Sequence, residues 1–283
     1  PFDARDKIIE HAPDVMVCDV VMPRMDGIEF IRRLLPQYPL RVVVVSSLSE
    51  KVLDAMNAGA VDFVAKPDIA AGRNSSMFVS ELVSKIKIAA QANISRFCKG
   101  QSCGPKTIAA RTETSKKIIA IGASTGGTEA ISSILAQLPG DLPGIVIVQH
   151  IPPVFSRMFA ERLDKSTSFS VKEAEHGDYV ERGRVIIAPG GKHMRVRKVG
   201  DRLKIELSEG AEGERYCPSV NVLFESVAKY CGRDAVGVIL TGMGDDGARG
   251  LLAMRNAGAS TIGQDEKSAV VYGMPKVAYE IGA

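Results

Sequence analysis

Short apolar runs alternate with stretches of helical periodicity through the first third of the chain. The run at 40–47 is too rich in valine for a helix and predicts a buried strand. Apolar runs at 14–19 and 61–67 predict two more strands. Four segments have the 3.6-residue period of helices, namely 3–11, 25–35, 50–60 and 76–90. This alternation predicts an α/β domain, a doubly wound parallel sheet with helices on both faces.

A polar, basic segment at 93–115 interrupts this rhythm. Glycine and proline punctuate it, which predicts an interdomain linker with solvated charges. Beyond it, strands are expected at 118–121, 145–149, 185–188 and 235–240, and helices near 126–137, 154–164, 219–230 and 247–257. Residues 193–207 alternate like a β-hairpin that turns near Gly200. We therefore predict a first domain at 1–92 and a second α/β domain at 116–283.

The composition fits two globular domains and argues against several classes of protein. The 283 residues, 45% of them hydrophobic, suffice for two cores. A net charge of +3, 5% aromatic residues and no tryptophan argue against nucleic-acid binding. The five cysteines are scattered without metal-ligand spacing, which argues against disulfides and zinc and indicates a reduced, cytoplasmic protein. No apolar run could span a bilayer and no signal peptide is visible, so no membrane insertion is expected.

The stretch "IIAIGASTGGTEA" at 118–130 passes from a strand pattern through small residues into a helical pattern. Gly122 to Gly126 match G-x-S-x-G, in which small neighbours allow a sharp turn that exposes the serine oxygen. The helix start also offers N–H groups that could hold an oxyanion. The rival dinucleotide motif G-x-G-x-x-G would need a glycine at Ser124 and a later acid for ribose. These residues alone leave a serine nucleophile, a phosphate-binding loop and a plain turn open.

A serine nucleophile needs a base and an orienting acid. His150 ends the strand "GIVIVQH" at the same sheet edge as Ser124, where open α/β sheets place their sites. His193 also follows a strand and is the main competitor. The loop "TGMGDDG" ends another strand and carries Asp245 and Asp246. One acid could cap the next helix while the other faces the imidazole, and a metal site ranks last.

Several longer motifs resemble one family. The chemotaxis protein-glutamate methylesterases are similar in "IIAIGASTGGTEA", "VIVQHIPPVFS", "RVIIAPGGKHM", "CPSVNVLFESVA", "VILTGMGDDGARGL" and "IGQDEKSAVVYGMPKVA". The segments "CDVVMPRMDGIEF", "VVVVSS" and "DFVAKP" resemble the receiver domain of a response regulator. The resemblance covers nearly the whole chain except the linker. It implies a flavodoxin-type receiver and a Rossmann-like methylesterase domain with a β-hairpin excursion.

The resemblance also implies roles for single residues. Ser124 matches the nucleophile, His150 the base and Asp246 the acid, and the N–H groups of Thr125 and Met243 would line the oxyanion hole. The implied reaction is hydrolysis of γ-glutamyl methyl esters on chemoreceptors, with deamidation of receptor glutamines and without a cofactor. The segments "CPSVN" and "QDEKSAVVYGMP" are expected to shape the substrate groove.

In the receiver part, Asp19 matches the phosphorylated aspartate, Ser46 the switch hydroxyl and Lys66 the lysine that pairs with the phosphoryl group. The phosphoryl donor implied is a chemotaxis histidine kinase. A complete receiver begins with a strand and an acidic pair that holds Mg²⁺ together with the phosphoacceptor. This sequence is expected to be truncated before that point, lacking the first strand and first helix and exposing the sheet. Asp19 would therefore bind Mg²⁺ only where the acidic pair is present.

The domain order predicts gating. The unphosphorylated receiver would cover the Ser124 edge, and phosphorylation would uncover it by a population shift. Two alternatives belong to other classes. One is a phosphate- or nucleotide-binding module without chemistry, and the other is a phosphorylation-dependent adaptor with an inert output domain.

Overall fold

The computed structural model describes residues 2–47, 49–67, 75–94, 118–211 and 214–283. The chain divides into two compact units, Pro1–Ser102 and Cys103–Ala283. Of the predicted linker at 93–115, residues 95–115 lie outside the described residues. In the described ranges, no helix combines the length and apolar content that a bilayer crossing requires.

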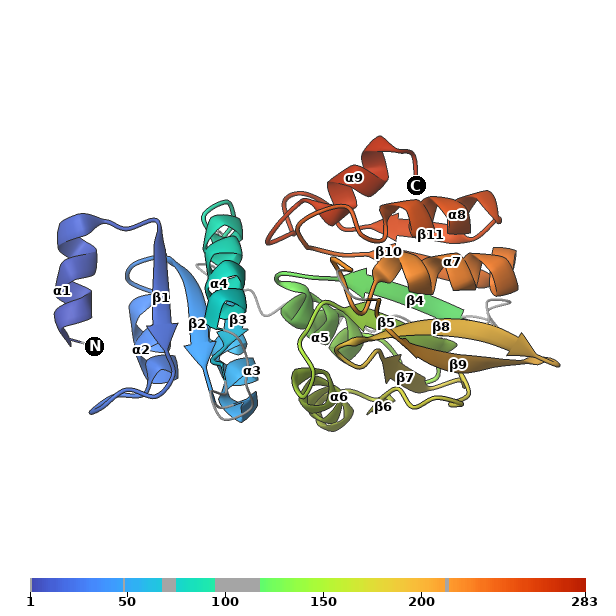
Figure 1. Ribbon diagram of the computed structural model, residues 1–283, viewed down its shortest axis with the longest axis horizontal. Coiled ribbons are helices and arrows are strands. Elements are labelled where there is room, and N and C mark those ends of the chain that lie inside the picture. Colours follow the sequence, from blue (N-terminus) through green and yellow to red (C-terminus); the bar gives the residue numbers. More distant parts are fainter. Residues whose placement is uncertain (1, 48, 68–74, 95–117, 212–213) are drawn as a thin grey trace. The chain divides into compact units, whose positions relative to one another are not determined.

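The first unit contains a parallel sheet in the order β1-β2-β3, with helices between the strands (Figure 1). Its elements are α1 (Phe2–His11), β1 (Val15–Asp19), α2 (Gly27–Leu34), β2 (Arg41–Ser46), α3 (Ser49–Asn57), β3 (Asp62–Ala65) and α4 (Ser75–Ala89). The valine-rich run became the central strand β2, and Val42, Val43 and Val44 are fully buried in it. Three consecutive buried side chains fit a strand covered on both faces.

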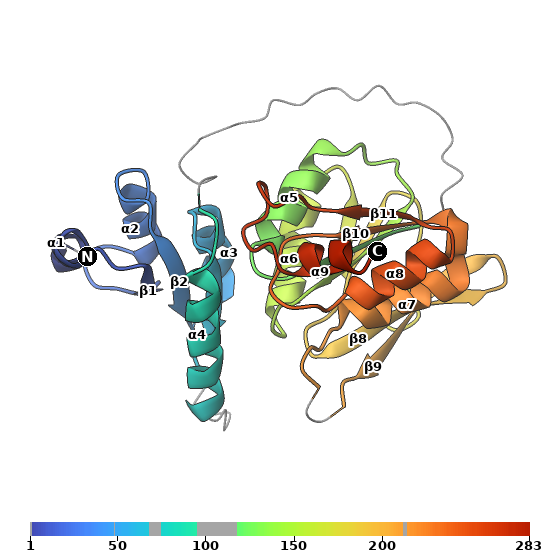
Figure 2. The ribbon, with the colours of Figure 1, turned by 90° about the horizontal axis from the view of Figure 1, so that it is seen from above.

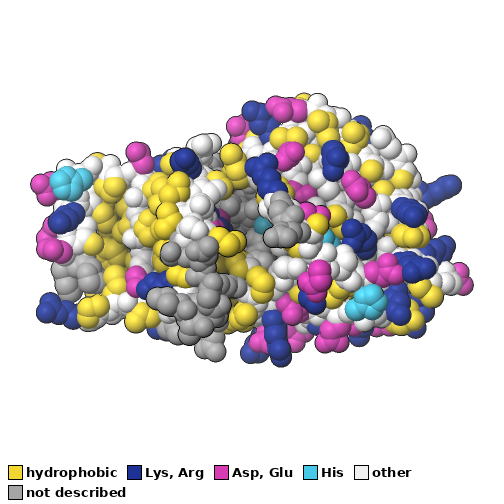
Figure 3. Space-filling model, viewed as in Figure 1, with side chains coloured by type: hydrophobic (Ala, Val, Ile, Leu, Met, Phe, Trp, Pro, Cys, Tyr) yellow, Lys and Arg dark blue, Asp and Glu magenta, His cyan; other side chains and the backbone are white. Residues whose placement is uncertain are grey.

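Hydrophobic side chains reach the surface of the first unit in several places (Figure 3). On β1, which is an edge strand of the described sheet, Val17 is 45% exposed, and Val21 just after it is 56% exposed.

The second unit contains a six-stranded, all-parallel sheet in the order β11-β10-β4-β5-β7-β6 and a separate antiparallel hairpin. Its strands are β4 (Ile118–Ala123), β5 (Gly144–Gln149), β6 (Ser170–Glu173), β7 (Arg184–Ile187), β8 (Lys192–Val199), β9 (Arg202–Glu209), β10 (Ala235–Ile239) and β11 (Ser260–Gly263). Its helices are α5 (Gly127–Gln137), α6 (Phe155–Ser166), α7 (Val220–Cys231), the short 3₁₀ helix η2 (Gly232–Asp234), α8 (Ala248–Asn256) and α9 (Met274–Glu280). The predicted α/β class with parallel sheets is confirmed in both units.

Helices cover both faces of the large sheet (Figures 1 and 2). One face packs on α7, whose Leu223, Phe224 and Val227 share a buried cluster with strand residues Ile118 and Val146. The helices α5 and α6 lie on the opposite face. Crossovers between parallel strands are right-handed, and the connection from β4 to β5 runs toward one edge of the sheet whereas the connection from β10 to β11 runs toward the other edge. The strand order therefore reverses between β4 and β10, and α/β sheets bind ligands at such a switch point, outside the carboxyl ends of the strands.

The predicted hairpin is present, and four elements were missed. The strands β8 and β9 pair with Val199 opposite Arg202, so Gly200 and Asp201 form a two-residue turn as expected. The elements that the pattern did not predict are β6, β11, η2 and α9. Each strand has only four residues, and β11 has no fully buried position, so neither has an apolar run to detect.

Candidate active site

The predicted serine and histidine follow neighbouring strands at the switch point. Ala123 and Gln149 are the last paired residues of β4 and β5, and Ser124 and His150 come directly after them. The His150 N–H donates to the carbonyl of Ala123 at 3.0 Å. The Ser124 N–H donates to the carbonyl of Thr241 at 3.0 Å, which ties the end of β4 to the loop after β10. Three strand ends therefore meet at one edge of the sheet.

The serine turn needs glycine at two places for different reasons. A Cβ at Gly122 would lie 2.2 Å from Cγ1 of Val220, so only glycine lets the first residue of α7 approach this closely. Gly126 has a φ of +77°, which side chains rarely adopt, and its Cβ would lie 2.7 Å from Cβ of Val270. The chain turns sharply here, since α5 begins at Gly127, and Ser124 stays half-buried.

Asp246 contacts the imidazole of His150. Oδ2 of Asp246 is 2.8 Å from Nε2 of His150, and the two side chains are 2% and 13% exposed. The same carboxylate accepts the N–H groups of Val220 at 2.7 Å and Asn221 at 3.0 Å, and the hydroxyl of Ser219 at 2.8 Å. These residues form the N-terminus of α7, where unpaired N–H groups and the helix dipole favour a negative charge.

The neighbouring acid is in a different environment. The side chain of Asp245 is 69% exposed, and its nearest cation is Arg215 at 4.0 Å. The structure brings Asp246, and not Asp245, to the imidazole of His150.

These hydrogen bonds fix the charge of Asp246 and the proton on His150. Burial alone would raise the pKa of Asp246, but the hydrogen bonds from His150, Asn221 and Val220 outweigh burial and hold the pKa below its usual range. The carboxylate is therefore ionised at neutral pH and accepts a proton from Nε2. Nδ1 of a neutral His150 is then the basic nitrogen, and this buried atom has no hydrogen-bond partner among the described residues.

The predicted oxyanion donors differ in their surroundings. The side chain of Thr125 is buried, and that of Met243 is 39% exposed. Within the described ranges, the Met243 N–H has no hydrogen-bond acceptor, which leaves it available to a ligand. Met243 follows Gly242, whose Cβ would lie 2.7 Å from Cβ of Ser124, so this loop lies directly against the serine.

The other histidines have different surroundings. The ring of His193 is buried and contacts Glu214 and Ser219. Nδ1 of His176 accepts the N–H of Leu207, and His11 belongs to the first unit.

Comparisons with known proteins show the family to which this chain belongs. The model of the CheB methylesterase family matches residues 119–283, which is more than half of the chain. The chain belongs to the CheB methylesterase family. The model of the response regulator receiver domain matches residues 1–72. The structure of the CheB methylesterase catalytic domain of Thermotoga maritima is similar over 59% of this chain and 89% of that one, with 37% identity and a TM-score of 0.57.

Curated relatives of this CheB-type chain carry a double name. A protein-glutamate methylesterase/protein-glutamine glutaminase of Syntrophomonas wolfei is 56% identical, over all of this chain and 82% of that protein. A relative with the same function in its name, from Salmonella typhi, is 49% identical over all of this chain and 82% of that protein.

In the receiver part of this CheB-type chain, the three predicted residues also lie at strand ends. Nζ of Lys66 is 2.5 Å from Oδ2 of Asp19, whose other oxygen accepts the Val21 N–H at 3.2 Å. Ser46 is buried at the end of β2, and its carbonyl accepts the Lys66 N–H at 2.9 Å. The carboxyl ends of the parallel strands β1, β2 and β3 therefore bring the three predicted residues to one edge.

Receiver domains are phosphorylated, typically with Mg²⁺. Mg²⁺ prefers an octahedral set of oxygen ligands. Among the described residues, no group of three candidate ligand atoms converges at Asp19. Mg²⁺ sites commonly combine one or two carboxylates with water, and Asp19 supplies one such carboxylate at this edge.

One residue of the site escaped the sequence analysis. The ring of Tyr216 stacks on the imidazole of His150, with centroids 4.6 Å apart and planes at 9°. Burial raises the pKa of Tyr216, so the phenol stays neutral at physiological pH. A single aromatic residue in a loop has no periodicity that would predict its role. The sequence feature that could have indicated Tyr216 is its position directly before the "CPSVN" motif.

The ionised state of Asp246 predicts a pH dependence of stability. Its pKa is lower in the folded protein than its ordinary value of 3.8, so its contribution is fully present above about pH 5 and is lost as pH falls through the folded-state pKa. We expect Asp246→Asn to lower the free energy of unfolding most above about pH 5, with a difference from the wild type that shrinks below about pH 4. Urea unfolding of both proteins from pH 3 to 7 measures this, and a pH-independent difference would contradict the assigned charge.

Proposed function

We propose that this chain hydrolyses γ-glutamyl methyl esters on chemoreceptors, releasing methanol, and deamidates receptor glutamines. The observation that supports this most is the His150–Asp246 pair beside the serine turn. The imidazole binds an ionised, buried carboxylate through Nε2, and its Nδ1 is left without a partner among the described residues. A general base with this arrangement is what a serine nucleophile requires.

We assign the first half of the reaction as follows. Ser124 Oγ attacks the ester carbonyl carbon while Nδ1 of His150 takes the hydroxyl proton. The N–H groups of Thr125 and Met243 stabilise the oxyanion, and Asp246 stabilises the charged imidazole. The imidazolium then gives its proton to the departing methoxy oxygen, so methanol leaves and an acyl-serine remains.

In the second half, water attacks the acyl carbon and Nδ1 accepts its proton. Return of that proton to Ser124 Oγ releases the glutamate product. A glutamine substrate follows the same path with ammonia as the leaving group. Ser124 Oγ and Nδ1 make no hydrogen bond in the described structure, and catalytic hydrogen bonds of this kind often tighten only when substrate binds.

The same geometry disfavours a phosphate- or nucleotide-binding loop. The carboxylate of Asp246 is buried and ionised behind the loop that would hold the phosphate. A negative charge in a poorly solvated position repels an anion more strongly than it would in water.

We further propose that phosphorylation of Asp19 gates this activity. A chemotaxis histidine kinase would donate the phosphoryl group. Lys66 would pair with the group and Ser46 would respond to it, as their positions beside the strand end of Asp19 support.

Methanol release from methylated chemoreceptors tests both proposals when the whole chain is compared with residues 116–283. We expect both to release methanol and the shorter protein to be faster, because it lacks the receiver. Methanol release by neither protein would contradict the esterase. Equal or slower release by the shorter protein would contradict gating alone.

A further inference from the structure

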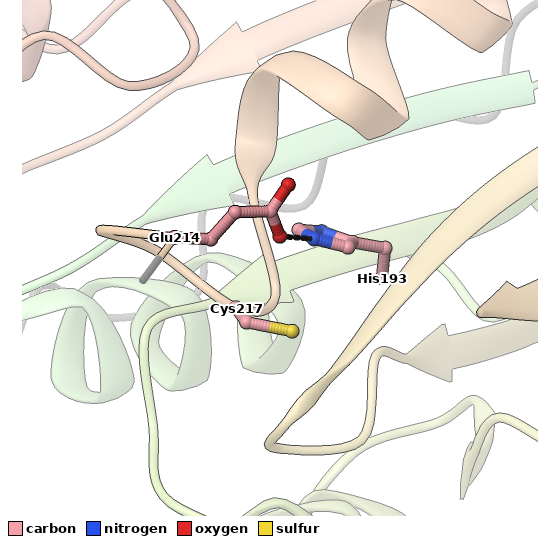
Figure 4. Close-up of side chains that lie close together, drawn as sticks. All are labelled: His193, Glu214 and Cys217. Carbon is pink, nitrogen blue, oxygen red and sulfur yellow. Dashed lines mark hydrogen bonds and ion pairs between the residues drawn. The ribbon is translucent and has the colours of Figure 1, made fainter. Parts of the chain in front are cut away.

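A second buried histidine lies behind the carboxylate of the active site. His193 on β8 is 4% exposed. Its Nε2 lies 2.5 Å from Oε2 of Glu214, and its Nδ1 lies 3.2 Å from the backbone nitrogen of Ser219. Figure 4 shows the ring and the carboxylate pointing toward each other, with the sulfur of Cys217 to one side.

The ligand atoms of His193, Glu214 and Cys217 lie within 4.8 Å of one another, so the cluster has to be weighed as a metal site. Zinc bonds to nitrogen and oxygen are about 2.0–2.2 Å long, which separates tetrahedral ligands by about 3.3 Å. The imidazole and carboxylate are closer than that and hydrogen-bond directly. Hydrogen bonding accounts for the cluster better than a metal does.

The backbone of Ser219 selects one tautomer of His193. Its N–H points at Nδ1, so Nδ1 is the acceptor and carries no proton. The ring proton is therefore on Nε2 and is donated to Glu214. This hydrogen bond is the main reason why the pKa of Glu214 is lowered, and it fixes the plane of the ring.

Ser219 links this ring to the active site. Its hydroxyl donates to Oδ1 of Asp246 at 2.8 Å, and it is the N-cap residue of α7. The next two N–H groups of that helix donate to the same carboxylate. A continuous path of hydrogen bonds thus runs from Glu214 through His193, Ser219 and Asp246 to His150.

We propose that His193, oriented by Glu214, is a positioning residue that holds Asp246 in place through Ser219 and so sets the tautomer of His150. The expected effect of this role on kcat rests on the proposed function. The arrangement of protons that it predicts does not depend on turnover.

The kinetic test replaces the ring. His193→Leu removes the acceptor for the Ser219 N–H and is expected to lower kcat for methanol release by about 10- to 100-fold, with little change in KM. His193→Asn places an amide oxygen near the position of Nδ1 and is expected to restore most of kcat. His176→Leu removes another imidazole that accepts a backbone N–H, that of Leu207, outside the hydrogen-bond path. It is the matched control and is expected to keep the wild-type kcat.

A double variant separates positioning from a general effect on packing. Ser219→Ala removes the hydroxyl that contacts Asp246, and we expect its loss of kcat not to multiply with that of His193→Leu. Multiplying losses would show that His193 acts by another route. If His193→Leu does not fold, Ser219→Ala still tests the proposal. A loss of kcat in Ser219→Ala would support the role of the hydrogen bond from Ser219 to Asp246, and an unchanged kcat would contradict it.

Imidazole ¹⁵N and ¹H NMR detects which ring nitrogens carry protons along this path, and it needs no substrate. The chain has four histidines, so few imidazole signals have to be assigned. We expect a protonated Nε2 on both His193 and His150, and a shift or loss of the His150 Nε2–H signal in His193→Leu but not in His176→Leu. An Nδ1–H tautomer of His193, or an unchanged His150 signal in His193→Leu, would overturn the proposal. Zinc binding by the wild type that Cys217→Ser abolishes would also overturn it, in favour of a metal site. If the wild type releases no methanol, the proposed function fails while these spectra still decide the positioning role.

Discussion

Replacing Ser124 with alanine is expected to lower kcat for methyl ester hydrolysis by at least about 10⁴-fold. In the proposed mechanism the hydroxyl oxygen forms the bond to the substrate carbonyl carbon, and no other serine follows β4 at this sheet edge among the described residues. The loss should appear as failure to form the acyl-serine. Single-turnover methanol release and labelling of the serine by a fluorophosphonate measure it.

The fold should tolerate this change. Alanine is smaller than serine, and the hydroxyl of Ser124 makes no hydrogen bond with other described residues. Ser133→Ala, on the helix that follows the turn, is a matched control that should keep both activity and labelling. Substantial ester hydrolysis by folded Ser124→Ala would show that another group is the nucleophile.

Replacing Asp246 with asparagine is expected to lower kcat by about 10⁴-fold while the protein remains folded at neutral pH. The amide of asparagine can donate to Nε2 of His150, which would move the ring proton to Nδ1. The nitrogen that should accept the serine proton would then already carry one. The asparagine also offers one acceptor oxygen in place of two to the donors at the start of α7.

The adjacent acid provides the control for this variant. Asp245→Asn alters an exposed side chain that lies 4.0 Å from Arg215 and has no contact with the imidazole. It should leave kcat and the ¹⁵N signature of His150 nearly unchanged. Equal losses in Asp245→Asn and Asp246→Asn would contradict the assignment of one acid to the imidazole.

Strands with a long buried run were predictable, and short or exposed elements were not. All six residues of β5 are buried, so its apolar run stands out in the sequence. By contrast, β11 pairs at the edge of the sheet and buries little, so its position depends on the β10 backbone beside it. Edge pairing of this kind leaves no periodic signal in the strand itself.

The sequence by itself determined the α/β class, the resemblance to one family and the prediction that Ser124, His150 and an acid follow strand ends. The resemblance already selected Asp246 as the acid that faces the imidazole, and only the tertiary structure decided which ring nitrogen is left as the base. The tertiary structure alone revealed that Tyr216 stacks on His150 and that His193 connects to Asp246 through Ser219. The physical reason is that these contacts are hydrogen bonds and ring stacking between residues far apart in the chain. These contacts form because the first residue of α7, Val220, packs against Gly122. The pattern of residues along the chain does not predict this packing.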